Sequence, residues 1–317
     1  MSIYITIDGG TTNTRINLIK SGTIIDSIKL NIGAKSSIEN KDSYKNEIKT
    51  AIERVLKNNH LCEEEISQII ASGMITSEFG LCNLEHIDVP AGISELHSSI
   101  EKKELKDISN IQFAFIRGVK TNSCDFDNAD IMRGEETELM GIINADYGKC
   151  VYVLPGSHSK IIYVDETGRI TDFSTMLTGE MIEALARQTI LKDAVDLEQS
   201  EIDCENLFRG YDYCRREGIN KALFKVRILN NVFGSDKTQT YSFFIGVVLS
   251  AEIEQIKKAD AETVVIGGKA QIKKAMAEIL RKISDKKIIV LNEESVTLST
   301  SVGAIRIFEN DYKQELT

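Results

Sequence analysis

The first 20 residues contain a short β-branched strand that ends in a carboxylate and a glycine-rich turn. Isoleucine occupies positions 3, 5 and 7, and Asp8-Gly-Gly-Thr-Thr-Asn13 follows directly. Residues 14–20 then return as a second strand, and 23–31 form a third. Such a turn gathers backbone N–H groups that can bind phosphate oxygens, and Asp8 could hold Mg²⁺ directly or through water. The alternative is an ordinary Asp-Gly hairpin, which the turn alone does not exclude.

The same strand–turn–strand pattern occurs a second time, although the residues themselves are not repeated. A strand over 150–154 leads to Pro155-Gly-Ser-His-Ser159, a strand returns as far as Asp165, and 170–174 form a third strand. Two copies of one pattern indicate two similar domains that face each other across a cleft. We therefore expect an α/β fold in which each domain has a mixed β-sheet with flanking helices.

The rest of the first half predicts a crossover and an insertion. Residues 40–59 have the periodicity of an amphipathic helix, and 67–73 read as a strand that ends in glycine. Within the segment that follows, 95–106 favour a helix and 111–116 a strand. A further helix is expected over 131–145.

These elements give the expected division of the chain. The first domain should span residues 1–145, with a substrate-facing insertion at about 86–129 and a C-terminal helix over 295–317 that completes it. The second, mainly helical domain should span 146–294.

Composition excludes several classes of function. The chain has 317 residues and a net charge of −10, which argues against a nucleic-acid-binding surface. No apolar run is long enough to span a membrane, and the N-terminus lacks the features of a signal peptide. The six cysteines contain no C-x-x-C pair, so we expect reduced thiols in a cytoplasmic protein. The composition is compatible with a homo-oligomer as well as with a monomer.

A third glycine turn follows the strand that ends at Ile266. It reads Gly267-Gly268-Lys269 and opens a helix. Two hairpin turns could hold the β- and γ-phosphates of a nucleotide, while this turn lets adenine and ribose lie against the backbone. The chain contains neither a Walker A loop nor a Rossmann fingerprint, and each turn taken singly could be only a turn.

Four stretches together resemble one known family. They are Asp8–Arg15, Met132–Thr137, Leu154–Lys160 and Met176–Glu180. With them the chain resembles the 2-dehydro-3-deoxygalactonokinase family, in the acetate and sugar kinase/Hsc70/actin superfamily. The resemblance implies two actin-like, ribonuclease H-like domains, of which the second, 146–294, binds the nucleotide. Three differences, at Gly9, Ile161 and Arg117-Gly118, leave the phosphate turns intact and bear on sugar specificity.

The resemblance also implies an activity and its cofactors. It implies transfer of the γ-phosphate of ATP, with Mg²⁺, to the terminal 6-hydroxyl of 2-dehydro-3-deoxy-D-galactonate, in D-galactonate catabolism. Asp8 would organise the metal. Substrate contacts are expected from three cations, Arg15, Arg133 and Lys160. Nucleotide contacts are expected from the three turns, at Gly9, Gly10, Thr11, Thr12, Asn13, Gly156, Ser157, His158, Ser159, Gly267 and Gly268.

A carboxylate near the start of the 131–145 helix would accept the hydroxyl proton. Glu135 is the first choice and Asp130 the second. Glu135 and Glu136 could instead simply complement the helix N-terminus, where carboxylates are favoured. Likewise, Arg133 could form a surface ion pair rather than bind the substrate carboxylate.

Two other functions stay open at this stage. A non-catalytic actin-like nucleotide-binding protein is the alternative outside the enzymes, and residues 132–136 argue against it. Within the enzymes, the alternatives are a glucokinase-like or gluconate-type kinase of the same superfamily.

Overall fold

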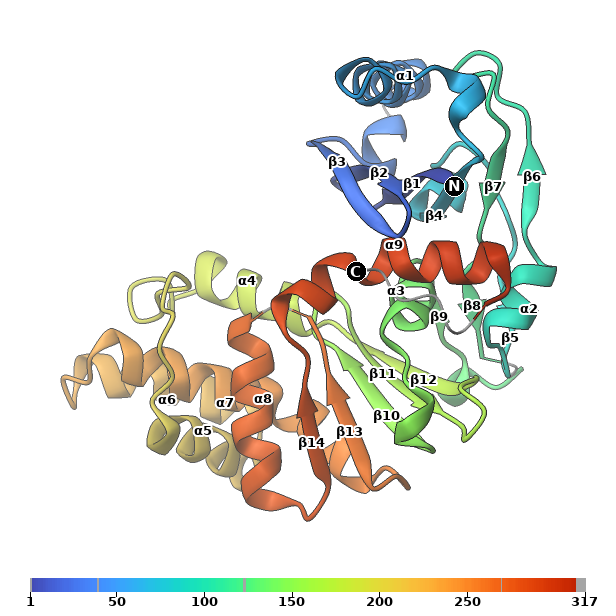
Figure 1. Cartoon of the computed structure of the whole chain (residues 1–317). Helices are drawn as coiled ribbons and strands as arrows, with labels where there is room; N and C mark the ends of the chain where they lie inside the picture. Colours follow the sequence, from blue (N-terminus) through green and yellow to red (C-terminus); the bar gives the residue numbers. More distant parts are fainter. Residues whose placement is uncertain (1, 39, 122–123, 269, 312–317) are drawn as a thin grey trace. The chain divides into compact units, whose positions relative to one another are not determined.

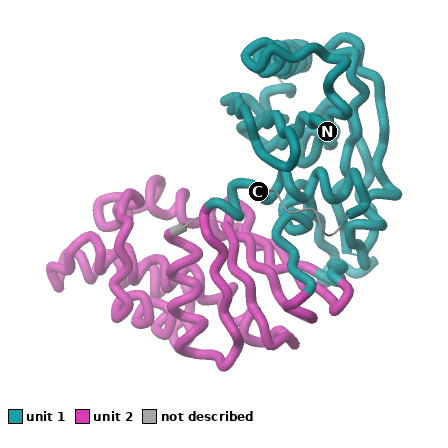
Figure 2. Tube along the Cα trace, viewed as in Figure 1, with its two compact units in different colours: residues 1–145, 168–172, 294–317 teal, residues 146–167, 173–293 magenta. Residues whose placement is uncertain are grey.

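The computed structural model describes residues 2–38, 40–121, 124–268 and 270–311. The chain forms two compact units, coloured separately in Figure 2. Unit 1 contains residues 1–145, 168–172 and 294–317, and unit 2 contains 146–167 and 173–293. Lys269 of the third glycine turn lies outside the described residues.

Unit 1 is built on a six-stranded mixed sheet with the order β3-β2-β1-β4-β7-β6 (Figure 1). β1 runs antiparallel to β2 and parallel to β4, as the predicted β-β-β-α-β order requires. The first four predicted strands are confirmed to within two residues. The strands are β1 (Ile3–Gly9), β2 (Thr14–Lys20), β3 (Thr23–Leu30), β4 (Gln68–Gly73), β6 (Glu101–Lys103) and β7 (Phe113–Phe115).

Helix α1 (Lys41–Asn58) makes the predicted crossover between β3 and β4. Its N-cap Asn40 accepts a hydrogen bond from the Ser43 backbone N–H at 3.0 Å, which satisfies one of the free donors of the first turn. The apolar face of the helix is buried against the sheet and explains the periodicity: Tyr44, Ile48, Ala51, Ile52, Val55 and Leu56.

The insertion contains a short helix and strands of two sheets. Helix α2 spans Ile93–Ser98, and β6 follows it as the edge strand of the main sheet. The expected helix over 95–106 is therefore wrong beyond α2, because residues 101–103 pair antiparallel with β7. A small second sheet has the order β5-β8-β9, formed by Ile87–Asp88, Val119–Lys120 and Ile131–Met132.

Helix α3 (Glu135–Ile142) belongs to unit 1, as does all of α9 (Glu293–Glu309) after its first residue. The expected helix over 131–145 begins four residues later than predicted, because Gly134 has a φ of +113° and residues 131–132 form β9. A Cβ at Gly303 would overlap the Thr137 carbonyl oxygen, so α9 and α3 pack backbone to backbone.

A further, five-stranded sheet has the order β12-β11-β10-β13-β14 and belongs to unit 2 except for residues 170–172 of β12. This order matches β3-β2-β1-β4 of unit 1, because β10, like β1, has an antiparallel neighbour on one side and a parallel neighbour on the other. The predicted α/β fold with a repeated strand pattern is thus confirmed. The strands are β10 (Cys150–Leu154), β11 (Ser159–Val164), β12 (Ile170–Met176), β13 (Thr263–Ile266) and β14 (Lys287–Val290).

Helices make up the rest of unit 2, and α7 lies at their centre. Residues on every side of α7 are buried, and it packs against its neighbouring helices in one apolar core. The helices are α4 (Thr178–Gln188), α5 (Cys204–Glu217), α6 (Ile219–Asn231), α7 (Lys237–Lys258) and α8 (Ala270–Ile283). Short 3₁₀ turns cover Ala34–Ile38, Glu63–Glu65, Met74–Thr76, Phe126–Asn128 and Ala145–Tyr147.

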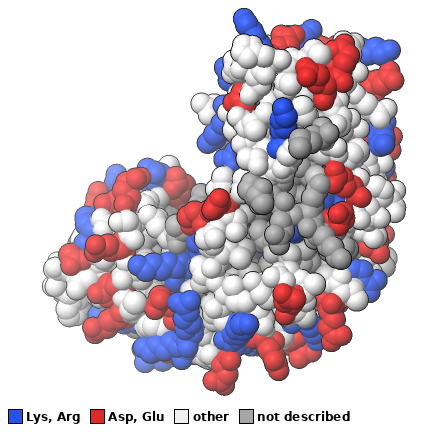
Figure 3. Space-filling model, in the orientation of Figure 1, with Lys and Arg blue, Asp and Glu red and all other residues white. Residues whose placement is uncertain are grey.

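Acidic and basic side chains are interspersed over the face drawn in Figure 3. All six cysteines are free thiols, three of them buried. In the part of the chain that is described, no helix is both long and apolar enough to cross a bilayer.

Candidate active site

The first turn closes tightly at the end of β1. The Gly10 N–H donates to the Asn13 carbonyl at 2.8 Å, and the Gly10 carbonyl accepts from the Ala34 N–H at 3.0 Å. Thr11, Thr12 and Asn13 are exposed beyond it. A Cβ at Gly9 would lie 2.6 Å from the Ile75 Cβ, so close packing also requires the glycine there. The structure thus brings the five predicted nucleotide residues of unit 1 into one turn.

Asp8 lies beside this turn and next to the start of α3. It is the register partner of Arg15 in the β1–β2 pair. Burial raises the pKa of Asp8, while the Arg15 guanidinium lowers it and the Glu135 carboxylate raises it. A Cβ at Gly134 would lie 3.2 Å from the Gly73 Cα, which shows how closely the start of α3 approaches the end of β4. The predicted metal ligand and the first-choice base therefore share one electrostatic environment.

The first turn of α3 holds three carboxylates, and the structure separates their surroundings. Glu136 is fully buried and accepts hydrogen bonds from the Gly134 N–H at 2.7 Å and the Thr137 hydroxyl at 2.9 Å. Burial and the neighbouring Glu135 raise the pKa of Glu136 to about 7. Glu136 therefore has the helix-terminus role that was considered as the alternative. Glu135 accepts from the Arg133 N–H at 3.1 Å.

Glu138 is a carboxylate that the sequence reasoning missed. Burial raises its pKa to about 8, and the charges of Glu135, Asp8 and Glu136 add to the effect. The signal in the sequence was its spacing, because residues three apart lie on the same face of a helix. Four carboxylates thus interact at one place in unit 1, those of Asp8, Glu135, Glu136 and Glu138.

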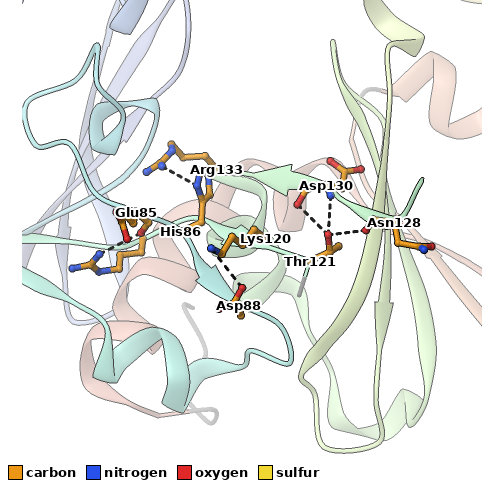
Figure 4. Close-up of polar contacts among 9 residues, drawn as sticks. Glu85, His86, Asp88, Lys120, Thr121, Asn128, Asp130 and Arg133 are labelled. Carbon is orange, nitrogen blue, oxygen red and sulfur yellow. Dashed lines mark hydrogen bonds and ion pairs between the residues drawn. The ribbon is translucent and has the colours of Figure 1, made fainter. Parts of the chain in front are cut away.

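Arg133 makes several internal contacts, and Figure 4 draws the one with His86. Its Nη1 donates to the Thr76 carbonyl at 2.7 Å and hydroxyl at 2.6 Å, and its Nη2 donates to the Leu84 carbonyl at 2.9 Å. Nη2 also lies 3.4 Å from His86 Nδ1, so the neutral imidazole carries its proton on Nε2. The guanidinium therefore holds residues 76–86 against the start of α3.

Asp130 lies in a different group of contacts within the small sheet. Its backbone N–H donates to the Thr121 hydroxyl at 2.7 Å, and its side chain accepts from the Ile131 N–H at 2.7 Å. Figure 4 shows Asp130 with Thr121 and Asn128, apart from Arg133 and His86. Asp130 is not one of the charges that shift the pKa of Asp8, whereas Glu135 is.

In unit 2, the second and third glycine turns pack on each other. The Gly267 N–H donates to the Val153 carbonyl at 2.9 Å, and a Cβ at Gly268 would overlap the Pro155 carbonyl oxygen. Gly268 also has a φ of +74°, which favours glycine. The turns that contain Gly156 and Gly268 are therefore neighbours, as a shared nucleotide site would need.

The second turn is also held by the start of α4. The Glu180 N–H donates to the Ser157 carbonyl at 3.2 Å, and His158 Nε2 lies 3.0 Å from Glu180 Oε1. The Ser159 hydroxyl points inward, where it donates to Glu252. Lys160, predicted to bind substrate, is only 4% exposed and donates to the Thr175 hydroxyl at 2.7 Å.

No group of three or more His, Cys, Asp or Glu side chains is arranged to hold a metal ion by itself within the described ranges. Mg²⁺ at a phosphoryl-transfer site is ordinarily held by one or two carboxylates together with the substrate phosphates. Asp8 fits that kind of site, because a complete protein cage is not required.

A model of the 2-keto-3-deoxy-galactonokinase family matches residues 8–300. The chain belongs to the 2-keto-3-deoxy-galactonokinase family. It is an enzyme of that family and thus a phosphotransferase. The match covers every predicted site residue, from Asp8 in unit 1 to Gly268 in unit 2.

Individual proteins agree with the family match. The chain is 26% identical to the 2-dehydro-3-deoxygalactonokinase of Escherichia coli (strain K12) over 256 residues, 80% of each chain. It is 32% identical over 128 residues, 40% of each chain, to a Rhizobium meliloti (strain 1021) protein provisionally assigned that activity.

Solved structures show the same fold. A Sinorhizobium meliloti protein provisionally assigned as a 2-dehydro-3-deoxygalactonokinase gives a TM-score of 0.77 at 21% identity, over 97% of this chain and 98% of that one. Component A of (R)-2-hydroxyglutaryl-CoA dehydratase from Acidaminococcus fermentans gives a TM-score of 0.51 at 15% identity, over 99% of this chain and 98% of that one.

Proposed function

We propose that this phosphotransferase moves the γ-phosphate of ATP to the terminal 6-hydroxyl of 2-dehydro-3-deoxy-D-galactonate, in D-galactonate catabolism. The observation that carries the proposal is the position of Asp8 near the end of β1, beside the first glycine turn and the start of α3, in a chain of this kinase family. The product would be a 6-phospho sugar acid, a substrate for an aldolase.

The chemistry needs positioning and charge neutralisation more than covalent help. The substrate O6 attacks the γ-phosphorus, the bond from that phosphorus to the β,γ-bridging oxygen breaks, and ADP leaves. Glu135 would accept the O6 proton, because its carboxylate lies at the start of α3 next to Asp8. Mg²⁺ would neutralise phosphate charge, and Asp8 would hold it directly or through water.

The glycine turns are the proposed nucleotide site. In unit 1 the exposed residues Thr11–Asn13 offer backbone N–H groups to phosphate, and in unit 2 the turn at Gly156–His158 offers others. The Gly267–Gly268 turn packs on the second turn and would receive the nucleoside. The substrate carboxylate needs a cation, for which Arg15, Arg133 and Lys160 stay the candidates.

A coupled assay of ADP release tests the proposal. Purified protein with Mg·ATP is given 2-dehydro-3-deoxy-D-galactonate, its gluco epimer, D-gluconate or D-glucose. We expect release with the first compound and a phosphomonoester at C6 by ³¹P NMR. ADP release with D-glucose but with none of the sugar acids would contradict the sugar-acid assignment. If none of the four compounds stimulated ADP release, the non-catalytic alternative would be favoured.

Asp8→Asn tests the metal role in the same assay. The variant should keep its fold and lose most turnover, because the amide cannot replace a carboxylate ligand of Mg²⁺. Asp26→Asn is the matched control, since Asp26 lies on β3 and accepts a hydrogen bond from Asn59 at 2.8 Å. Normal turnover by Asp8→Asn would exclude the metal role.

A further inference from the structure

Glu252 is a buried carboxylate in α7 that none of the preceding roles uses. It is 2% exposed, and both of its oxygens accept hydrogen bonds from hydroxyls. The Ser159 hydroxyl donates to Oε1, and the Thr178 hydroxyl donates to Oε2 at 2.7 Å. Burial raises the pKa of Glu252, and the two hydrogen bonds lower it. No cation pairs with it among the described residues.

The two donors belong to two segments that meet at the second glycine turn. Ser159 is the first residue of β11, directly after the turn, and Thr178 is the first residue of α4. A Cβ at Gly179 would overlap the Gly156 carbonyl oxygen, so the first turn of α4 lies directly on the glycine turn. Glu252 thus links the start of β11 to the start of α4 through one hydrogen bond to each.

A buried carboxylate is a costly way, in free energy, to make a purely structural contact. A buried carboxylate without a cation is costly, and apolar side chains join helices to sheets at lower cost. What the carboxylate adds is direction, because each oxygen fixes one hydroxyl and therefore one backbone segment. The two fixed segments border the turn at Gly156, Ser157 and His158, the residues proposed to meet phosphate.

We propose that Glu252 is a positioning residue for nucleotide phosphate, which holds the turn at 155–158 and the start of α4 in one geometry. This inference rests on the proposed function, in which the second turn binds ATP. It also assigns the Ser159 side chain to Glu252 rather than to the nucleotide, since the single hydroxyl proton is donated inward.

Steady-state kinetics with Glu252→Gln and Glu252→Ala tests the inference. Gln can keep one acceptor, whereas Ala removes both, so we expect the KM for Mg·ATP to rise by about tenfold in the first and about a hundredfold in the second. The KM for the sugar acid should change by less than about twofold. Glu254→Ala is the matched control, because Glu254 lies on the same helix and instead meets Tyr211 and Arg215.

Thr178→Val keeps the shape of the side chain and removes one donor. Its effect on the KM for Mg·ATP should be less than additive with that of Glu252→Ala, since the alanine variant has already lost the oxygen that accepts from Thr178. If Glu252→Ala does not fold, the KM of Glu252→Gln for Mg·ATP decides the matter. Equal rises in both KM values, additive effects, or an unchanged KM for Mg·ATP in a folded variant would overturn the inference.

Calorimetric titration with the Mg complex of a non-hydrolysable ATP analogue separates this inference from the proposed function. If the wild-type protein binds the analogue and Glu252→Gln binds it equally well, only the role of Glu252 is wrong. If the wild-type protein does not bind it, the proposed nucleotide site is wrong, and the inference is wrong with it.

Discussion

Glu135 and Asp130 differ in the charges that surround them. Glu135 raises the pKa of Asp8, whereas Asp130 bonds within the small sheet. We therefore expect Glu135→Gln to lower kcat by roughly a hundred- to ten-thousand-fold, the usual contribution of a general base, with little change in substrate Kd. Asp130→Asn is the control and should lose much less. A normal Glu135→Gln enzyme beside an inactive Asp130→Asn enzyme would make Asp130 the base.

Glu138 should make stability depend on pH. Its pKa is raised by burial to about 8 in the folded protein, above its ordinary value of 4.5. The folded state therefore keeps a proton that the unfolded state releases, and stability falls as pH rises from about 4.5 towards 8. Glu138→Gln should melt at a higher temperature than the wild type at pH 8, and the difference should shrink at pH 5. A difference independent of pH would contradict this assignment.

Arg133→Lys tests whether the guanidinium has a second role besides its internal contacts. One ammonium group cannot reach both the Thr76 and Leu84 carbonyls, so the free energy of unfolding should fall by about 2 kcal/mol. If Arg133 also binds the substrate carboxylate, the KM for the sugar acid should rise far more than that for ATP.

Arg306→Lys is the control for this measurement. Arg306 on α9 likewise donates to two backbone carbonyls, those of Met140 and Gly141, and should affect stability alone. Equal KM changes for both substrates in Arg133→Lys would point to a structural role.

Among the elements, α3 and α9 are held at unusually short range. Their backbones meet at Gly303 and Gly141, where added Cβ atoms would overlap the Thr137 and Ser299 carbonyl oxygens. Gly303→Ala should therefore lower the free energy of unfolding by about 3 kcal/mol, at the upper end for overpacking. Gly148→Ala, with nothing within 4 Å but a φ of +57°, should cost only about 1 kcal/mol. Equal melting temperatures for the two variants would show that the helices can separate.

Much of the architecture could be predicted because local patterns determine it. Alternating isoleucines identified β1, and the second strand–turn–strand pattern identified β10 and β11. Residues 101–103 were misread as helix, since only the pairing with β7 makes them a strand. Glu252 and the contacts of Arg133 could not be predicted, because burial and hydrogen-bond partners depend on segments far apart in sequence.

The order of the segments along the whole chain gives a last prediction. Unit 1 takes its final helix, α9, from residues after unit 2, and that helix contributes side chains to the first sheet. The Ser301 hydroxyl lies 2.8 Å from the hydroxyl of Thr6 on β1 and accepts from Asn17 Nδ2 on β2 at 2.8 Å. All strands of the unit 2 sheet lie before α9.

A chain that ends at residue 293 should therefore lose order in unit 1 and keep it in unit 2. We expect hydrogen exchange in β1, β2 and α3 to become faster by at least about a hundredfold, since exchange follows local unfolding free energy. Protection in β10 and β13 should stay within about tenfold of the full-length protein. Gly303→Ala in the full-length chain is the control, and should change unit 1 in the same direction by a smaller amount. Loss of protection throughout both units would mean that unit 2 depends on unit 1 for its stability, and the two-unit division would then not describe how the protein folds.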